Sequence, residues 1–331
     1  MARILNEEKD NLILNGDYSV DQRNASLVGT PYDVDAGLTN KYLFDRWRLR
    51  FDETAVTSSS HRALFTLGQE EVPGQPKYYA SITMGASSLG TYRMFTQAIE
   101  DVRTLAGKNA GVNFWVRSSI NTTIQYGFQQ NFGSTGSPSS PALTALTSVV
   151  LVANTWTNVQ GIIAIPGIGG KTLGTDENSD YLDFRIYFAQ NTAMTIDFAQ
   201  AAVWKDYPKQ WEGHDDTIGK LQRYLEKSYG IDTKLAATGS GSGGLIMFNI
   251  ASGTSSVYVP LAYAIKRIAP QLTAYNWSTG ATGSARNTGN SATYTCTLDA
   301  IGVVAARAAL SSVSSGDAGL LHWAADADYY T

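Results

Sequence analysis

Acidic residues gather at three places where paired carboxylates could do chemistry. Glycosidases hold two carboxyl groups roughly 5–10 Å apart across a cleft, and burial or a like charge raises the pKa of the one that acts as general acid. All three groups lie in polar, loop-like sequence, which favours exposed carboxylates with ordinary pKa values. We therefore assign no catalytic residue. The groups are Glu70 and Glu71, then Asp176, Glu177 and Asp180 in the stretch DENSD, and finally Asp326 and Asp328.

The DENSD stretch also suits a hard cation. Calcium takes oxygen ligands, and Asp176, Glu177 and Asp180 would supply three carboxylates within five residues of sequence. A solvated acidic loop explains the same residues, so both interpretations stay open. Calcium is the only cofactor for which the sequence offers a candidate site.

Transition-metal and nucleotide sites are not indicated. His61, His214 and His322 are far apart, with no HxH or HxxxH spacing among them. The single cysteine, Cys296, excludes a cysteine-built zinc site and an intrachain disulfide, and its alternating context ATYTCTL predicts a small core residue. The stretches GSGSGG and GIGGKT contain glycines but lack the full spacing of a phosphate-binding loop, so we interpret them as a linker and a turn.

Aromatic side chains on the polar faces of strands are the remaining candidates for binding. The C–H surfaces of sugar rings stack on the faces of Trp and Tyr, while neighbouring polar side chains bind the hydroxyl groups. Trp115 illustrates the pattern, because it lies on the strand face opposite Val112, Phe114 and Val116. Burial under a second layer or in an oligomer contact is the alternative for each candidate. The candidate ligand-binding residues are Trp115, Tyr181, Tyr187, Tyr258 and Trp277.

The charge of the chain excludes some partners. Charged residues make up only 16% of the 331 residues, the formal net charge is −4, and Lys and Arg form no cluster. Nucleic acids and anionic membranes are therefore poor candidates. No apolar run is long enough to span a bilayer, and the N-terminus MARILNEEKDNLILNG lacks the layout of a signal peptide. We expect neither membrane insertion nor Sec-type secretion.

Short alternating segments separated by Gly, Ser, Asn and Pro dominate the chain. In YLDFRIYF, for example, Leu182, Phe184, Ile186 and Phe188 alternate with polar or aromatic neighbours. This period indicates antiparallel strands, and many such strands at regular spacing are typical of a jelly-roll sandwich. The sequence thus predicts an all-β fold: a leader over residues 1–14, a jelly-roll β-sandwich over 15–212, a connecting helix and Gly/Ser loop over 213–244, and a second, smaller β-sandwich over 245–331.

One stretch, DDTIGKLQRYLEKSYG, has helical spacing instead. Its apolar residues Ile218, Leu221, Leu225 and Tyr229 recur every three or four positions, Asp215 and Asp216 could cap its start, and Gly230 stands where a helix would stop. We predict a helix over about 216–229, whose apolar stripe packs under a sheet or against copies of itself around a threefold axis.

Five stretches in sequence order resemble phage tail, tail-fibre and other virion-appendage proteins. They are NGDYSVDQR, YLFDRWRL, QAIEDVRTLAGKNAGVNFWVR, LQRYLEKSYG and the terminal ADADYY. The predicted first domain, residues 15–212, also resembles the jelly roll of carbohydrate-binding modules. The resemblance implies a virion location, a homotrimer that contacts other virion proteins, and non-catalytic binding of host-surface polysaccharide or lipopolysaccharide. It implies no particular sugar-binding residue.

Three functions follow as hypotheses. The first is a receptor-binding virion appendage that binds glycan without catalysis. The second is a purely structural virion protein, such as a tail tip, head fibre or decoration. The third, and least favoured, is a polysaccharide depolymerase. Binding to cells without release of sugar favours the first hypothesis, whereas oligosaccharide release favours the third.

Overall fold

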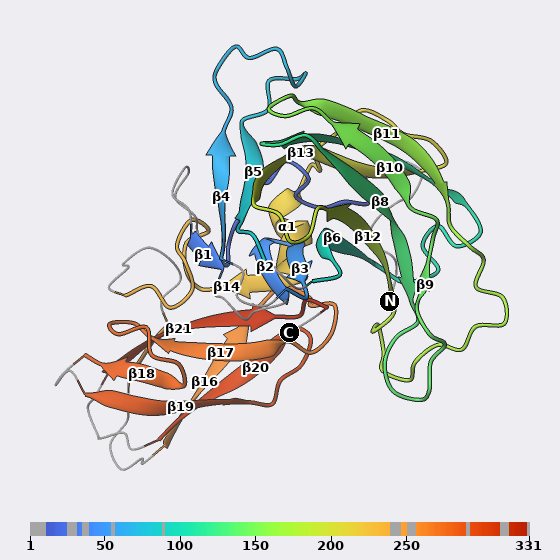
Figure 1. The fold of residues 1–331 in the computed structure, drawn as a ribbon. Helices are drawn as coiled ribbons and strands as arrows, with labels where there is room; N and C mark the ends of the chain where they lie inside the picture. Colours follow the sequence, from blue (N-terminus) through green and yellow to red (C-terminus); the bar gives the residue numbers. More distant parts are fainter. Residues whose placement is uncertain are drawn as a thin grey trace. The chain divides into compact units, whose positions relative to one another are not determined.

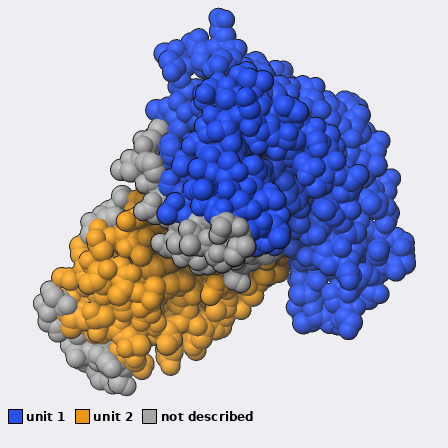
Figure 2. Space-filling view, viewed as in Figure 1, with its two compact units in different colours: residues 1–19, 26–217 blue, residues 20–25, 218–331 orange. Residues whose placement is uncertain are grey.

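A computed structural model of the chain describes residues 11–24, 32–34, 40–53, 57–87, 90–238, 246–249, 256–288, 292–311 and 318–329. The chain divides into two compact units, coloured separately in Figure 2. Unit 1 comprises residues 1–19 and 26–217, and unit 2 comprises residues 20–25 and 218–331. Nearly all the regular secondary structure of the two units consists of antiparallel strands, which confirms the predicted all-β fold. Among the described residues, no helix is long and apolar enough to cross a bilayer.

Unit 1 is a sandwich of two antiparallel sheets (Figure 1). The first sheet has six strands, in the spatial order β1 (Tyr32–Val34), β4 (Ser58–Leu64), β5 (Tyr78–Met84), β13 (Met194–Lys205), β7 (Asn109–Ser118) and β11 (Thr157–Ala164). The second has seven strands: β10 (Thr147–Leu151), β8 (Thr122–Asn131), β12 (Tyr181–Phe188), β6 (Arg93–Glu100), β3 (Trp47–Phe51), β2 (Asn40–Phe44) and, paired with β8, β9 (Ala142–Leu143).

The core of unit 1 lies between these sheets. Side chains alternate across each strand, so the fully buried Phe114 of β7 and Phe184 of β12 meet edge to face, with ring centroids 6.1 Å apart. Trp47 of β3 stacks on Phe95 of β6 at 4.7 Å. Each such side chain contributes about 1.5–3 kcal/mol by leaving water. The inward faces predicted from alternation in β7 and β12 are confirmed.

Residues 11–14, which the sequence assigned to a leader, belong to this core instead. Leu12 and Ile13 are buried, and the Leu12 amide donates to the carbonyl of Val203 in β13 at 2.8 Å. The Gln97 side chain accepts from the Leu14 amide at 2.8 Å and donates to its carbonyl at 2.9 Å. These paired bonds satisfy backbone groups that burial would otherwise leave without partners.

Unit 2 is one eight-stranded antiparallel sheet with its own core. Long strand β21 pairs with four others, and the buried residues around it include Cys296, Leu310 and Leu321. The predicted core position of Cys296 is confirmed. The strands are β14 (Leu225–Lys227), β15 (Ile246–Asn249), β16 (Ser256–Ala262), β17 (Gln271–Asn276), β18 (Ser284–Asn287), β19 (Thr293–Asp299), β20 (Ala305–Ser311) and β21 (Ala318–Asp326).

The predicted helix over 216–229 is wrong in its extent. Helix α1 covers only Thr217–Gln222, and Leu225 begins β14, where it pairs with Asp326 of β21. Leu221, Leu225 and Tyr229 are buried within unit 2, whereas Ile218 is 45% exposed. A helix stripe at a threefold axis is therefore wrong as well. Pairing with β21 supplies backbone hydrogen bonds that outweigh a helical preference already weakened by Gly219.

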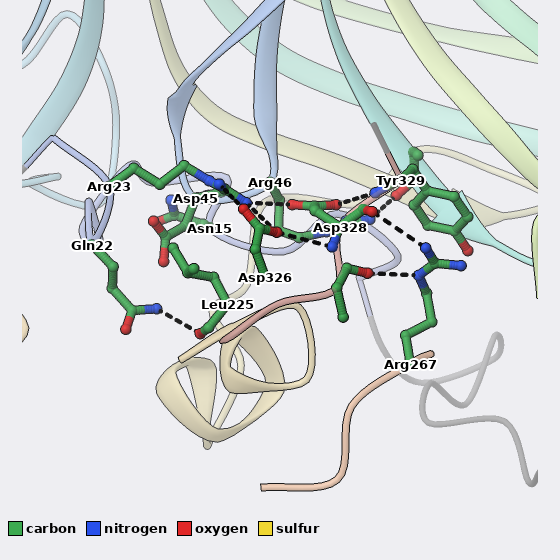
Figure 3. A network of polar contacts seen from close by, with 12 residues as sticks. Asn15, Gln22, Arg23, Asp45, Arg46, Leu225, Arg267, Asp326, Asp328 and Tyr329 are labelled. Atoms are coloured by element: carbon green, nitrogen blue, oxygen red, sulfur yellow. Dashed lines mark hydrogen bonds and ion pairs between the residues drawn. The ribbon is translucent and has the colours of Figure 1, made fainter. Parts of the chain in front are cut away.

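A short N-terminal segment, residues 20–25, is part of unit 2. Figure 3 shows two of its residues, Gln22 and Arg23, in contact with Leu225 and Asp326. The Gln22 side chain donates to the carbonyl of Leu225, and the Lys227 ammonium donates to the carbonyl of Gln22 at 2.6 Å. The Arg23 guanidinium pairs with Asp326 and, at 3.4 Å, with Asp328. The first and last strands of unit 2 are thus tied to residues near the start of the chain.

Candidate functional site

The candidate site lies on the outward face of the first sheet of unit 1. Asn113 and Trp115 of β7 point away from the core, because the residues between and beside them face inward. In register on β11, Gln160 stands opposite Asn113 and Asn158 stands opposite Trp115. Four side chains that can bind polar ligands therefore share one patch of sheet.

The chain that follows β13 folds back over this patch. A Cβ atom on Gly111 would lie 1.9 Å from the carbonyl carbon of Tyr207 and 2.2 Å from the nitrogen of Pro208, so only glycine permits this approach. The Asn113 side-chain amide donates to the carbonyl of Lys209 at 2.8 Å. Residues 207–211 thereby form one wall of the site.

The loop between β4 and β5 forms the other wall. Val72 in this loop is fully buried against Trp156 and Ala199. The Gln200 side-chain amide donates to the carbonyl of Pro73 at 2.9 Å. Gln200 occupies a bulge in β13, where the register shifts between Ala199 and Ala202 and its φ is 49°. Bulges re-aim side chains, and this one turns Gln200 into the site.

Between the walls lies a cavity of about 300 Å³. Its floor carries a chain of amide hydrogen bonds, in which Gln160 donates to Asn158 at 2.7 Å and Asn158 donates to Asn113 at 2.8 Å. The lining residues are Pro73, Asn113, Trp115, Asn158, Gln160, Gln200, Pro208, Lys209, Gln210 and Trp211. The set combines two indoles, five side-chain amides and one ammonium, with no carboxylate.

This composition suits binding rather than acid–base catalysis. Trp115 is only partly buried and packs against the cluster formed by Val72, Trp156 and Ala199, so its orientation is set by the fold. Indole faces stack on sugar C–H surfaces, and amides bind hydroxyl groups. Most glycosidases act through two carboxyl groups, and the described residues that line the cavity supply none.

A charged cluster adjoins the cavity on the same face of the sheet. Arg117 of β7 forms two hydrogen bonds with Asp197 of β13, at 2.7 and 2.9 Å, and lies over the rings of Trp156 and Tyr79. Burial opposes the charge on Arg117, but the Asp197 carboxylate outweighs burial and raises the pKa of Arg117. Burial lowers the pKa of nearby His61 despite the Asp197 charge. The Asp197 carboxylate is thus held in an ion pair.

Comparison with known proteins gives only distant likenesses. No protein-family model matches the chain, and no curated protein matches it in sequence. The family 11 carbohydrate-binding module from Clostridium thermocellum, in complex with a mixed-linked tetrasaccharide, is 13% identical over 56% of this chain and 100% of its own, with a TM-score of 0.33. A CBM4 structure is 16% identical over 58% of this chain and 98% of its own, with a TM-score of 0.33.

A phage protein is also among the similar solved structures. The enzymatically active domain of tailspike protein 4 from bacteriophage CBA120 is 16% identical over 59% of this chain and 21% of its own, with a TM-score of 0.34. Likenesses this distant carry no argument about ligand or role.

The structure does not bring the five predicted aromatic residues together. Only Trp115 lines the cavity. Tyr181 and Tyr187 lie on the outward face of the second sheet, where Tyr181 is buried beside Asn131 and the Tyr187 hydroxyl meets Arg185 at 3.3 Å. Tyr258 and Trp277 belong to unit 2. Tyr258 is 59% exposed, and the guanidinium of Arg307 lies over its ring. Trp277 is partly buried, and its ring centroid lies 5.9 Å from Cζ of Arg286.

The carboxylates of the DENSD stretch diverge. The Asp176 carboxylate accepts from the Ser134 hydroxyl at 2.7 Å, and hydrogen bonds from Thr135 and Ser134 lower the pKa of Asp176. Asp180 instead accepts from the Val102 amide at 2.9 Å, and Glu177 is exposed. Within the described part of the chain, no group of three or more potential metal ligands gathers here or elsewhere. The calcium interpretation gains no support.

Sequence reasoning missed most of the cavity. Asn158 and Gln160 alternate with the buried Val159, which was a readable signal for a polar strand face. Trp211 stands in YPKQWEG, where an indole in a polar, proline-containing segment is a second signal. Gln200 could not have been found, because β13 reads as a regular strand and its bulge depends on pairing with β7.

Proposed function

We propose that unit 1 binds a glycan in the cavity on the outward face of its first sheet, without hydrolysing it. The observation that carries the proposal is the lining itself, in which two indoles and five amides meet without a carboxylate. Trp115 provides a stacking platform on β7, which lies between β11 and β13, and the amides beside it bind hydroxyl groups. The ligand is held by shape, stacking and hydrogen bonds.

Affinity electrophoresis against a panel of soluble polysaccharides tests this proposal. We expect at least one polysaccharide to retard the protein, and Trp115→Ala or Trp211→Ala to weaken that binding about tenfold or more, because each removes a stacking surface. Tyr258→Ala is the matched control, since it removes an exposed aromatic of unit 2 and should leave binding unchanged. Equal retardation of all three variants contradicts the assignment of the cavity.

The same protein should release no sugar from a polysaccharide that it binds. Incubation followed by a reducing-end assay measures this directly. Release of oligosaccharides that survives Trp115→Ala but not loss of an exposed acidic pair such as Glu70 and Glu71 would transfer the function to the depolymerase hypothesis.

We further propose that the glycan is a host-surface polysaccharide or lipopolysaccharide and that the protein is a homotrimeric virion appendage. The resemblance of five sequence stretches to phage tail proteins supports this role. Three linked sites would turn weak single-site binding into firm attachment. Sedimentation equilibrium should give the mass of a trimer. A stable monomer removes the avidity argument, and docking to another virion protein without glycan binding favours the purely structural hypothesis.

A further inference from the structure

The orientation of the amides on the cavity floor is set by a backbone carbonyl. A carbonyl oxygen can only accept hydrogen bonds, so the Asn113 group that faces Lys209 O at 2.8 Å must be its NH₂. Asn113 Oδ1 therefore accepts from Asn158 Nδ2, and Asn158 Oδ1 accepts from Gln160 Nε2. Every amide in the chain points the same way.

The series of amide hydrogen bonds ends at Gln160 with an oxygen. Because Gln160 donates through its NH₂, its Oε1 is the terminal acceptor, and successive hydrogen bonds in one direction polarise such a group further. Gln160 is also exposed, so this oxygen can be reached by a ligand. The series of amides thus presents Gln160 Oε1 as a strengthened acceptor at the β11 side of the cavity.

Gln200 offers a second acceptor by the same logic. Its Nε2 donates to the carbonyl of Pro73, so its Oε1 is the atom left to meet a ligand. Trp115 stands on β7, between β11 with Gln160 and β13 with Gln200. Gln160 stands opposite Asn113, and Gln200 lies in the bulge between Ala199, which is opposite Trp115, and Ala202, which is opposite Asn113. Adjacent strands are about 4.8 Å apart, so the two glutamine backbones lie about 10 Å apart on either side of β7, at the Asn113 end of the Trp115 platform. A ring that stacks on Trp115 and extends toward Asn113 therefore has one glutamine at each edge.

The one charged group of the lining is directed at aromatic rings. Lys209 Nζ lies 4.9 Å from the ring centroid of Trp204 and 5.6 Å from that of Tyr207. Cation–π contacts of this kind hold an ammonium against an aromatic face. Among the described residues that line the cavity, the polar contacts offered to a ring on Trp115 are accordingly those of neutral amides.

From this arrangement we infer that the cavity selects a neutral pyranose with unsubstituted hydroxyl groups on two opposite edges, which donate to Gln160 Oε1 and Gln200 Oε1 while the ring stacks on Trp115. A carboxylate in place of either hydroxyl would face an acceptor without a proton to share, and an O-acyl group would remove the donor. This inference rests on the proposed glycan binding and adds its specificity.

The test compares neutral and acidic polysaccharides on the same gels. The neutral probes are β-glucan, galactan and mannan, the acidic probes are polygalacturonate and alginate, and acetylated glucomannan is run before and after deacetylation. We expect retardation by at least one neutral probe, none by the uronates, and binding of glucomannan, where it occurs, only after deacetylation. Binding of a uronate as tight as that of any neutral probe overturns the inference.

Two substitutions of Gln160 assign the specificity to that residue. Gln160→Ala should weaken binding of the neutral probe about tenfold, the effect of losing one well-placed hydrogen bond to the ligand. Gln160→Lys replaces the acceptor by a cationic donor and should lose the neutral probe while gaining polygalacturonate. Gln125→Ala is the matched control, because Gln125 is an exposed strand glutamine on the second sheet that bonds only to Ser148 among the described contacts.

The outcomes separate this inference from the proposal beneath it. If Trp115→Ala abolishes binding but both Gln160 variants bind as the parent does, glycan binding stands and the hydroxyl selection is wrong. If no polysaccharide retards the parent protein, glycan binding at this cavity is wrong, and the selection is wrong with it.

Discussion

At the scale of single residues, neighbours decide what each group can do. The cavity amides are oriented by the Lys209 carbonyl, and the Asp197 carboxylate is engaged by Arg117. Cys296 shows the effect of burial most directly. It is 4% exposed in the core of unit 2, and loss of solvation raises the pKa of its thiol to about 11.

Cys296 should therefore be unreactive in the folded protein. We expect Ellman's reagent at pH 8 to modify it only slowly before denaturation and rapidly afterwards, because the thiolate is the reactive form and the thiol is inaccessible. Fast modification of the folded protein contradicts the buried position.

The raised pKa of the Cys296 thiol also makes the stability of unit 2 depend on pH. The folded-state pKa lies above the unfolded value of 9.0, so the protonated thiol stabilises unit 2 fully below pH 9, and this contribution is lost as the pH rises through about 11. The stability of unit 2 against urea should therefore fall as the pH rises above 9. The fall should be smaller in Cys296→Ala. An identical alkaline loss in both proteins would assign the effect to the buried tyrosines Tyr229 and Tyr275, whose pKa values burial also raises.

At the scale of elements, the cavity depends on two departures from regular strand structure. The bulge in β13 turns Gln200 toward the site, and the absence of a side chain at Gly111 lets residues 207–211 cross β7. Neither is part of the hydrophobic core. Both are local features that shape the outward face of a sheet whose inward face packs into the hydrophobic core.

Gly111→Ala tests the importance of that crossing. The new methyl group would collide with the backbone of residues 207–208, so the wall segment must move, at a cost of about 1–3 kcal/mol. We expect glycan retardation to fall at least as far as in Trp211→Ala while unit 1 stays folded by circular dichroism. Gly167→Ala is the control, because a Cβ there meets nothing within 4 Å. Equal glycan binding by both variants refutes the structural role of Gly111.

At the scale of the whole molecule, the chain enters unit 2 twice. Residues 20–25 contribute Gln22 and Arg23 to it before the chain builds most of unit 1, and the rest of unit 2 begins at residue 218. Arg23 meets Asp326, and Asp328 is almost fully buried beside it, with a side chain 1% exposed. Unit 2 is therefore complete only when residues far apart in the sequence have met.

Arg23→Ala should destabilise unit 2 selectively. Removing one partner leaves the charge of buried Asp328 less compensated, and breaking buried ion pairs costs about 3 kcal/mol. Hydrogen exchange should accelerate in β14 and β21 but remain unchanged in β7 and β12. Arg103→Ala is the control, because Arg103 forms an exposed pair with Asp101. Unchanged protection in β21 would show that residues 20–25 are dispensable for unit 2.

The sequence by itself determined the all-β class, the inward faces of strands such as β7 and β12, the core position of Cys296 and the outward position of Trp115. These depend on the two-residue period of a strand, which is local and can be read without knowing what a strand pairs with. The tertiary structure alone decided the rest. Leu225 and Tyr229 have helical spacing, yet hydrogen bonding to β21, about 100 residues away, makes their segment strand and turn.

The cavity could not be predicted from the sequence for the same reason. Asn158, Gln160, Gln200 and Trp211 come from three separated stretches, and they converge only because β7 pairs with both β11 and β13 while residues 207–211 fold back across them. Local alternation says which way a side chain points from its own strand. Which other side chains it meets is set by long-range pairing, whose energy depends on contacts that no single stretch of sequence contains.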